Sequence, residues 1–232
     1  MYGRSGPLYD LMHPTRDYPG GAAELRRIIA QRSPEARSLL DVACGTGRHL
    51  HELQASFEVE GVDLNDALLA SARDRCPHVP LHLADMRDFS LSRVFDVVTC
   101  LFGSVGYLSS HEELVLTLKN LRRHVAPGGL LVVEPWLSPS DYRVGAWTAH
   151  GAHDDDKAVA WLYRAEVESG RSVFDIHHLV ATTSSVEHFV ERHSLALFTP
   201  EEYLAAFRAA GVDARLTQSA AFTYGLLVGT CS

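Results

Sequence analysis

Features of exported or membrane-bound proteins are scarce in this sequence of 232 residues. It has only four cysteines and no CxxC pair: Cys44, Cys76, Cys100 and Cys231. No apolar run approaches the roughly 18 residues that a membrane helix needs. The first residues, MYGRSGPLYDLMHPTRDY, lack the apolar centre of a signal peptide. We therefore expect reduced thiols, a soluble cytoplasmic protein and no membrane partner.

Positive charge is also in short supply. The chain has 21 Lys and Arg against 29 Asp and Glu, which gives a formal net charge of −8. Because a nucleic-acid backbone requires a basic face, we expect no nucleic-acid partner. A small anionic substrate remains compatible, since it needs only a few local arginines. The length and the hydrophobic content of 46% favour one well-buried domain, without repeats or low-complexity segments.

Apolar runs alternate with amphipathic segments through the first 134 residues. Strands are predicted at 38–43, 58–64, 79–84, 95–100 and 130–134, and a first helix at 22–31. Further helices are expected between the strands, and Ser110 and Glu113 have capping-box spacing at the start of one of them. Strands that are apolar throughout and alternate with helices indicate a parallel sheet covered on both faces. The predicted fold class is therefore α/β, doubly wound.

After Trp136 the pattern changes. Long β-rich segments joined by SGR and TTSS turns predict an antiparallel ribbon or small sheet over residues 158–197. A helix is predicted from Thr199-Pro200 onward, and the segments 214–217 and 226–230 are expected to complete the main sheet.

The glycine-containing turn DVACGTG, residues 41–47, suggests a ligand close to the backbone. A phosphate-binding P-loop needs a Lys after its glycines, and here Arg48 follows Gly47. A dinucleotide fingerprint needs a third small residue where Leu50 stands. The second predicted strand ends in Asp63, which can accept both hydrogen bonds of a ribose diol. Glycines and a diol-binding acid without a phosphate motif suit S-adenosylmethionine (SAM), a nucleoside that carries no phosphate.

This turn resembles motif I of the class I SAM-dependent methyltransferases, with Ala43 in place of the usual first glycine. The acid after the second strand, the Asp-Met pair after the third and the HVAPGG turn at 124–129 match the same class in order and spacing. The resemblance implies a Rossmann-like fold, SAM as cofactor, S-adenosylhomocysteine as product and no metal. The cofactor contacts that it implies are Tyr18, Asp41, Ala43, Gly45, Gly47, Asp63, Asp85, Met86 and Leu101.

A narrower resemblance covers nearly the whole chain. The segments LYDLMH, ADMRDFSL, FGSVGYL, VVEPW and HSLALFTPEEYLAAFRAAG are similar to N,N-dimethyltransferases that act on nucleotide-linked amino sugars, such as those making desosamine and mycaminose. This implies methyl transfer to the amine of a dTDP-linked deoxyamino sugar in antibiotic-sugar biosynthesis. Another small-molecule N- or O-methyltransferase and a non-catalytic SAM-binding subunit are the alternatives. The intact acids at Asp63 and Asp85 argue against the non-catalytic subunit.

Catalysis of methyl transfer requires mainly the alignment of nucleophile, carbon and sulfur. An amine must be neutral to attack, so a base near pH 7 or loss of its proton to solvent suffices. The family resemblance favours His124 as the base, and its alternative is a histidine favoured by a helix dipole. His13 is the second candidate and could also orient the substrate.

The diphosphate of the substrate needs arginine or lysine donors. The candidates are Arg16, Arg143, Arg164 and Arg171. The family commonly has an Arg within a Ser-Gly-Arg-Gly stretch near the C-terminus, whereas this chain has AFTYGLL, with Tyr224 at that place.

We predict a single domain over residues 1–232, with an N-terminal lid at 1–21 and an insertion at about 138–197. Ligands of open α/β sheets bind at the carboxyl ends of the strands, where the insertion starts, so we expect it to roof the acceptor pocket. A dimerisation ribbon, and thus a homodimer, is the alternative. The HxH motif at 49–51 and the His pair at 177–178 would direct their rings apart, so neither predicts a metal site.

Overall fold

The computed structural model describes residues 3–14 and 16–231. The helices are α1 (Tyr9–Met12), α2 (Tyr18–Arg32), α3 (Arg48–Leu53), α4 (Asp66–Arg75), α5 (His111–Arg123) and α6 (Pro200–Ala209), with 3-10 turns η1 (Gly6–Leu8) and η2 (Ser104–Tyr107). The main-sheet strands are β1 (Ser38–Val42), β2 (Glu58–Asp63), β3 (Leu81–Leu83), β4 (Phe95–Cys100), β5 (Val125–Val133), β11 (Asp213–Thr217) and β12 (Leu226–Thr230). The others are β6 (Trp147–His153), β7 (Lys157–Arg164), β8 (Glu166–Glu168), β9 (Arg171–Thr182) and β10 (Val186–Ala196).

The main sheet has the strand order β11-β12-β5-β4-β1-β2-β3. Strands β1 to β5 run parallel, while β12 pairs antiparallel with both β5 and β11. The doubly wound α/β prediction is therefore confirmed, and so is the prediction that the last two strands complete the sheet. The strand order reverses between β1 and β4. Open α/β sheets bind ligands at the carboxyl ends of the strands beside such a reversal.

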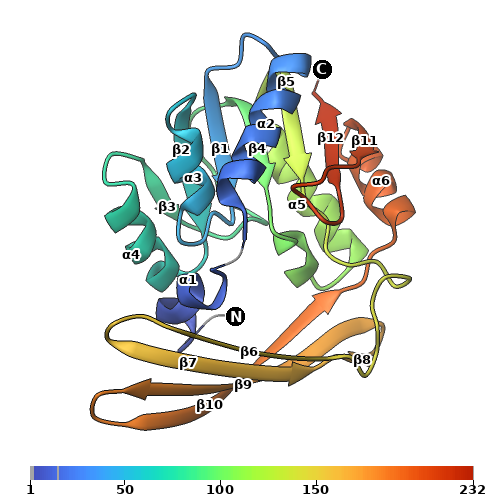
Figure 1. Ribbon diagram of the computed structural model, residues 1–232. Helices are drawn as coiled ribbons and strands as arrows, with labels where there is room; N and C mark the ends of the chain where they lie inside the picture. Colours follow the sequence, from blue (N-terminus) through green and yellow to red (C-terminus); the bar gives the residue numbers. More distant parts are fainter. Residues whose placement is uncertain (1–2, 15, 232) are drawn as a thin grey trace.

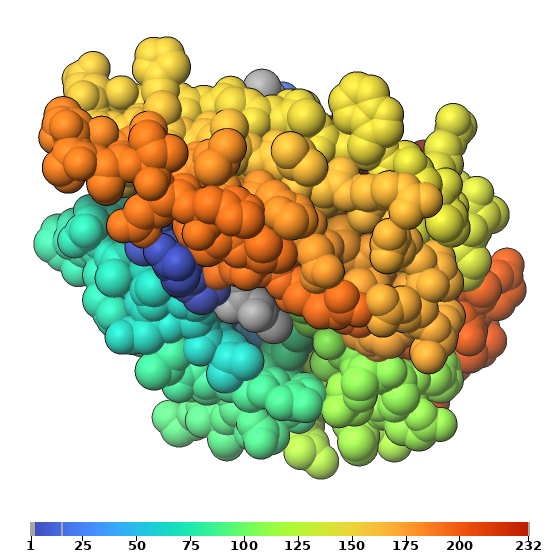
Figure 2. All heavy atoms as spheres, turned by 90° about the horizontal axis from the view of Figure 1, so that it is seen from below, coloured from blue at the N-terminus to red at the C-terminus, as the bar shows by residue number. Residues whose placement is uncertain are grey.

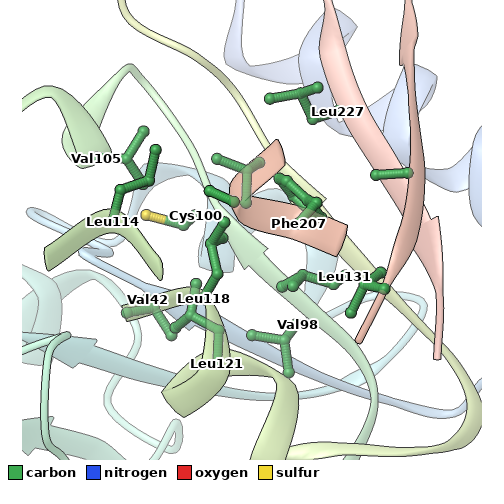
Figure 3. Close-up of a cluster of buried hydrophobic side chains, with 14 of the residues drawn as sticks. Val42, Val98, Cys100, Val105, Leu114, Leu118, Leu121, Leu131, Phe207 and Leu227 are labelled. Carbon is green, nitrogen blue, oxygen red and sulfur yellow. The ribbon is translucent and has the colours of Figure 1, made fainter. Parts of the chain in front are cut away.

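Two apolar cores cover the faces of this sheet. Figure 3 shows one of them, in which side chains of α5 and α6 meet the strands; it includes Val42, Val98, Leu114, Leu118, Leu121, Leu131 and Phe207. The other core packs α2, α3 and α4 on the opposite face. Each of these buried apolar side chains stabilises the fold by about 1.5–3 kcal/mol. The sheet is thus a rigid support for whatever lies at its carboxyl edge.

The chain starts with more regular structure than its sequence predicted. The first helix was predicted at 22–31, but η1 and α1 precede that segment, and α2 begins at Tyr18 instead of Ala22. The side chain of Asp17 caps α2 by accepting a hydrogen bond from the Gly20 N–H at 2.8 Å. Tyr18 therefore belongs to a capped helix and not to a loose segment.

The inserted sheet lies across the carboxyl edge of the main sheet, with α1 between the two (Figure 1). It runs antiparallel in the order β10-β9-β7-β6, with β8 paired to β9. The ribbon predicted at 158–197 is confirmed, and β6 is an additional strand. Leu8 and Met12 of the N-terminal segment pack against Val159 and Phe189 on the inner face of this sheet.

The four cysteines are buried, and none of them forms a disulfide. Across residues 3–14 and 16–231, none of the helices combines the length and the apolar character needed to cross a membrane.

Candidate active site

A cavity opens at the carboxyl ends of β1, β2 and β4, and we refer to it as the first cavity. The space between its walls, open solvent included, is about 900 Å³. It is lined by Tyr9, Tyr18, Asp41, Ala43, Cys44, Gly45, Thr46, Arg48, His49, Asp63, Leu64, Leu68, Ala84, Asp85, Met86, Leu101, Phe102, Ser104 and Tyr107. Of the nine residues predicted to contact a cofactor, only Gly47 is not among these.

The turn after β1 bends through three residues in the left-handed region. Ala43 has φ +59°, Gly45 φ +56° and Gly47 φ +73°. A Cβ at Gly47 would also lie 3.0 Å from the Cβ of Ala72, so this glycine lets α3 approach α4. For Ala43 the left-handed conformation costs about 1–2 kcal/mol, which a glycine would not incur. The turn therefore carries strain where its backbone borders the cavity.

Asp63, at the end of β2, fixes this turn. Its carboxylate accepts the Gly45 N–H and the Asn65 N–H, both at 2.8 Å. The side chain is 8% exposed, and burial raises its pKa above the usual value, although the backbone hydrogen bonds oppose the shift. Each carboxylate oxygen has two lone pairs, so Asp63 keeps acceptor capacity for a ligand in the cavity.

Asp41, at the carboxyl end of β1, is the second buried acid of the cavity. Burial raises its pKa to about 7, while a hydrogen bond from the Thr99 hydroxyl at 2.7 Å opposes this shift. A nearby cation would stabilise the ionised form of such a buried acid. Within residues 3–14 and 16–231, neither Asp41 nor Asp63 forms an ion pair, so the cavity offers two buried carboxylates to a ligand.

Asp85 and Met86 border the cavity after β3, as their sequence position suggested. Both carboxylate oxygens of Asp85 accept from the Arg87 guanidinium, at 3.0 and 2.7 Å, and this lowers the pKa of Asp85. Tyr18 and Leu101 lie on other walls of the same cavity. The Arg48 guanidinium sits 4.4 Å from the centre of the Tyr18 ring, a cation–π contact.

The N-terminal segment contributes Tyr9, which the sequence analysis missed. Its neighbour Asp10 accepts a hydrogen bond from the Thr46 hydroxyl at 2.7 Å and pairs with Arg75 at 2.6 Å. Arg75 also donates to the carbonyl of Thr46. These contacts hold α1 against the turn after β1, with Tyr9 in the lining of the first cavity. The LYDLMH motif was the available signal for Tyr9.

The FGSVGYL segment supplies three further lining residues that were not predicted, namely Phe102, Ser104 and Tyr107. A Cβ at Gly103 or at Gly106 would lie 2.8 Å from the Trp136 side chain. Both glycines are therefore needed for η2 to pack on this indole. In the sequence, the signal for these lining residues was a pair of glycines shortly after a strand, at the carboxyl edge of the main sheet.

Glu134, after β5, connects this segment to Arg16. Its Oε2 accepts the Phe102 N–H at 2.6 Å and pairs with the Arg16 guanidinium at 2.8 Å. Burial raises the pKa of Glu134, and the charge of Arg16 opposes the shift. The guanidinium also lies 3.9 Å from the centre of the Phe102 ring. Arg16 thus forms an ion pair with Glu134, and its predicted contact with a diphosphate stays a prediction.

The two predicted catalytic histidines differ in their surroundings. His124 is 4% exposed, its Nδ1 lies 2.9 Å from the Asn120 carbonyl, and its Nε2 accepts the Leu91 N–H at 3.1 Å. Its ring also stacks on Phe89. Both ring nitrogens are thus engaged, and His124 is not among the residues that line the first cavity. A role for His124 as general base stays a prediction.

His13 lies beside the first cavity. Its ring centre is 4.4 Å from that of Tyr9 and 5.5 Å from that of Phe102, two lining residues. Its Nδ1 lies 2.8 Å from the Tyr9 carbonyl. Burial lowers the pKa of His13, so the imidazole is neutral at physiological pH.

A second cavity lies on the other side of Trp136, where the main sheet meets the insertion. It is lined by Pro135, Trp136, Leu137, Ser138, Ser140, Asp141, Arg143, Phe198, Pro200, Tyr203, Leu216, Gln218, Thr223, Tyr224 and Leu227. The space between its walls, open solvent included, is about 1210 Å³. Arg143 and Tyr224, two of the predicted substrate contacts, line this same cavity. Within the described residues Arg143 forms no ion pair.

The other two predicted diphosphate contacts, Arg164 and Arg171, are not among the residues that line either cavity, and their role in substrate binding stays a prediction. Arg164 is directed outward from the inserted sheet and pairs with Glu166 at 2.9 Å. Arg171 donates to the Ser194 side chain and carbonyl, and to the carbonyls of Leu108 and Ser109, at 2.8–3.0 Å. Its donors fix β9 to the end of β10 and to the loop after η2.

The histidine motifs lie at different places in the fold. No group of three or more His, Cys, Asp or Glu side chains suited to a metal is found in the part of the chain that the structure describes. His177 is exposed and His178 is buried on the opposite face of β9. His49 is buried beside Tyr18, and burial lowers its pKa to about 3.

A parallel sheet reversing at β1, a strained turn after β1 and an acid at the end of β2 together define a class I SAM-dependent methyltransferase. A family model described as a methyltransferase domain matches residues 39–129. The chain is 41% identical over 231 residues to the dTDP-3-amino-3,6-dideoxy-alpha-D-glucopyranose N,N-dimethyltransferase of Streptomyces fradiae, covering 98% of this chain and 91% of that enzyme. It is 39% identical over 225 residues to the dTDP-4-amino-2,3,4,6-tetradeoxy-D-glucose N,N-dimethyltransferase of Saccharopolyspora spinosa, covering 96% and 90%.

Solved structures agree. DesVI of Streptomyces venezuelae superposes with a TM-score of 0.90 at 38% identity, covering 97% of each chain. SAM-bound CalS10, an amino pentose methyltransferase from Micromonospora echinaspora, gives 0.87 at 35% identity, again covering 97% of each. The chain therefore belongs to the family of amino-sugar N,N-dimethyltransferases.

Proposed function

We propose that this protein transfers methyl groups from SAM to the amine of a dTDP-linked deoxyamino sugar, in the biosynthesis of an antibiotic sugar. The observation that carries the proposal is the near-complete coverage, at about 40% identity, of relatives that are all named as dTDP-amino-sugar N,N-dimethyltransferases. By the same likeness, the product is the N,N-dimethylated sugar.

The side chains of the first cavity fit SAM. Two buried carboxylates, Asp41 and Asp63, and the absence of a phosphate-binding motif suit a cationic nucleoside without phosphate. Asp63 would bind the ribose diol, and Asp85 and Met86 the adenine. Arg48 would pair with the carboxylate at the methionine end. When bound, SAM supplies a methyl group already activated by its sulfonium.

The remaining task of the protein is alignment. Phe102 and Tyr9 close the cavity from two sides and exclude water from the reacting atoms. His13, neutral because of its burial, lies beside both rings and can accept a proton from the incoming amine or orient it. Since an aligned amine reacts without further chemical help, loss of His13 should slow methyl transfer without abolishing it.

The second cavity would hold the nucleotide part of the substrate. It adjoins Trp136, whose other side contacts the η2 turn that lines the first cavity. Arg143 is the candidate donor to the diphosphate. Tyr224 stands where relatives commonly have an Arg, so this chain would hold the diphosphate with fewer cations and one hydroxyl.

The outer face of the inserted sheet supports a homodimer. Seen from below, the sheet covers much of this side of the molecule (Figure 2). Its outward side chains include Leu162, Leu179, Val186 and Val190, and Val186 is 71% exposed. Exposed apolar side chains that recur across one face of a sheet are a feature of interaction sites, here interspersed with His177 and His188. Leu179→Glu should reduce the mass measured by light scattering from that of a dimer to that of a monomer.

The function is tested by incubating the protein with SAM and a panel of dTDP-amino sugars that differ in the position of the amine. Mass spectrometry should detect the addition of one and then two methyl groups to one of them. Methylation of the free amino sugar at an equal rate would favour a different small-molecule acceptor, because the nucleotide would then contribute nothing.

A further inference from the structure

Glu134 is a buried carboxylate at the carboxyl end of β5 that lines neither cavity. Its Oε2 accepts the Phe102 N–H at 2.6 Å and pairs with the Arg16 guanidinium at 2.8 Å. A single oxygen thus joins the ends of β4 and β5 to the N-terminal segment. Burying a carboxylate is costly unless it is paired and hydrogen-bonded, and these two contacts meet that requirement.

The backbone of Phe102 is in a conformation that needs such support. Its φ is +58°, in the left-handed region that is unfavourable for a residue with a bulky side chain. A hydrogen bond from its N–H to a carboxylate is stronger than one to a neutral oxygen, so Glu134 offsets this strain. Strained residues persist where their surroundings fix them, and they cluster at functional sites.

The ring of Phe102 is held by side chains of the N-terminal segment. The Arg16 guanidinium, which Glu134 binds, lies 3.9 Å from the centre of the ring. The ring centres of His13 and Tyr9 lie 5.5 and 6.4 Å from it, both nearly perpendicular to the Phe102 ring. Glu134 therefore fixes the backbone of Phe102 directly and its ring through Arg16.

We propose that Glu134 is a positioning residue for methyl transfer and that it acts through Phe102. Phe102 directly follows the carboxyl end of β4 and lines the first cavity, so its ring forms part of the wall that aligns the acceptor amine with the methyl group of SAM. The inference rests on the proposed function, because it concerns the same reaction. Glu134 itself contacts neither SAM nor the acceptor.

This arrangement links the N-terminal segment to the rate of the reaction. Arg16 lies two residues before Tyr18, another residue of the cavity lining, and its guanidinium is 5.8 Å from the centre of that ring. The Phe102 ring is therefore in its observed place only while Arg16 remains on Glu134. Since methyl transfer depends on alignment, loss of this ion pair should slow the chemical step and leave the binding of SAM intact.

Two variants remove the ion pair from either side. Glu134→Gln keeps an oxygen that can accept the Phe102 N–H but loses the charge that holds Arg16, and Arg16→Met removes the guanidinium. With saturating dTDP-amino sugar in single-turnover experiments, each should lower the rate about tenfold, as expected for one lost hydrogen bond to a charged group. Calorimetry should find the SAM affinity of Glu134→Gln unchanged.

Glu24→Gln is the matched control. Glu24 also pairs with an arginine, Arg27 on the same helix α2, at 2.7 Å, and it lines neither cavity. The control removes the same charge from the chain and should keep the native rate.

Double variants separate positioning from general structural damage. If Glu134 acts through Phe102, adding Glu134→Gln to Phe102→Gly should cost nothing further, because a glycine adopts the left-handed conformation without support and has no ring to place. A native rate in Glu134→Gln, a loss of SAM affinity as large as its loss of rate, or additive losses in the double variant would overturn the inference.

Should Glu134→Gln not fold, Arg16→Met alone and combined with Phe102→Gly decides the question by the same criteria. Failure of the native protein to methylate any dTDP-amino sugar would instead refute the proposed function.

Discussion

Replacement of Asp63 by alanine tests the assignment of the first cavity to SAM. The carboxylate is 8% exposed and accepts the N–H groups of Gly45 and Asn65 at 2.8 Å each. We propose that it also accepts from the ribose diol. Hydrogen bonds to a charged group contribute about 1.5–3 kcal/mol, so Asp63→Ala should weaken SAM binding roughly ten- to a hundredfold.

Isothermal titration calorimetry with SAM measures this change directly. Because Asp63 also fixes the turn after β1, thermal unfolding without cofactor must be compared first, and binding measured well below the lower midpoint. Asp66→Ala is the matched control, since that acid lies three residues away, is exposed and pairs with Arg73 at 3.1 Å. Equal affinity of Asp63→Ala and the native protein would refute the ribose assignment.

Other consequences can be measured separately. Ala43→Gly should raise the unfolding free energy by up to about 1 kcal/mol in denaturant titrations, because it relieves the left-handed strain at φ +59°; a loss of stability would contradict this. Burial raises the pKa of folded Asp41 to about 7, from the 3.8 usual for an aspartate, so its contribution makes stability fall as pH rises between these values, and Asp41→Asn should flatten that slope. Arg143→Ala should raise KM for the nucleotide sugar without changing SAM affinity. Arg164→Ala, on the outer face of the inserted sheet, should change neither quantity. If both variants changed KM to the same extent, the diphosphate would bind elsewhere. Activity should survive EDTA, and a chelator-sensitive enzyme would revive a metal site.

Elements with local signals were predictable from the sequence. The Ser110 cap and the Thr199–Glu202 capping box start α5 and α6 at the expected residues, because the capping contacts lie within a single turn. The parallel strands β1, β4 and β5 are mostly apolar, which is a local signal for buried strands. Strand β6 was missed because Trp147–His153 is mostly exposed, and its pairing with β7 gives no apolar pattern of its own.

Side-chain roles at the site were predictable only where the backbone imposes them. Asp63 and Gly45 follow from strand ends and turn geometry. The partners of arginines and histidines depend on tertiary packing, so the sequence could not reveal that Arg171 bonds to Ser194 or that both nitrogens of His124 are engaged. Tyr107 was missed for the same reason, since its partner His193 lies 86 residues away along the chain.

The most direct test of the proposed activity compares a dTDP-amino sugar with its free amino sugar, both incubated with the native protein and SAM carrying a deuterated methyl group. We expect the nucleotide sugar to gain first one and then two labelled methyl groups, with a much lower rate for the free sugar. No label on any dTDP-amino sugar, by a protein that binds SAM, would contradict the account.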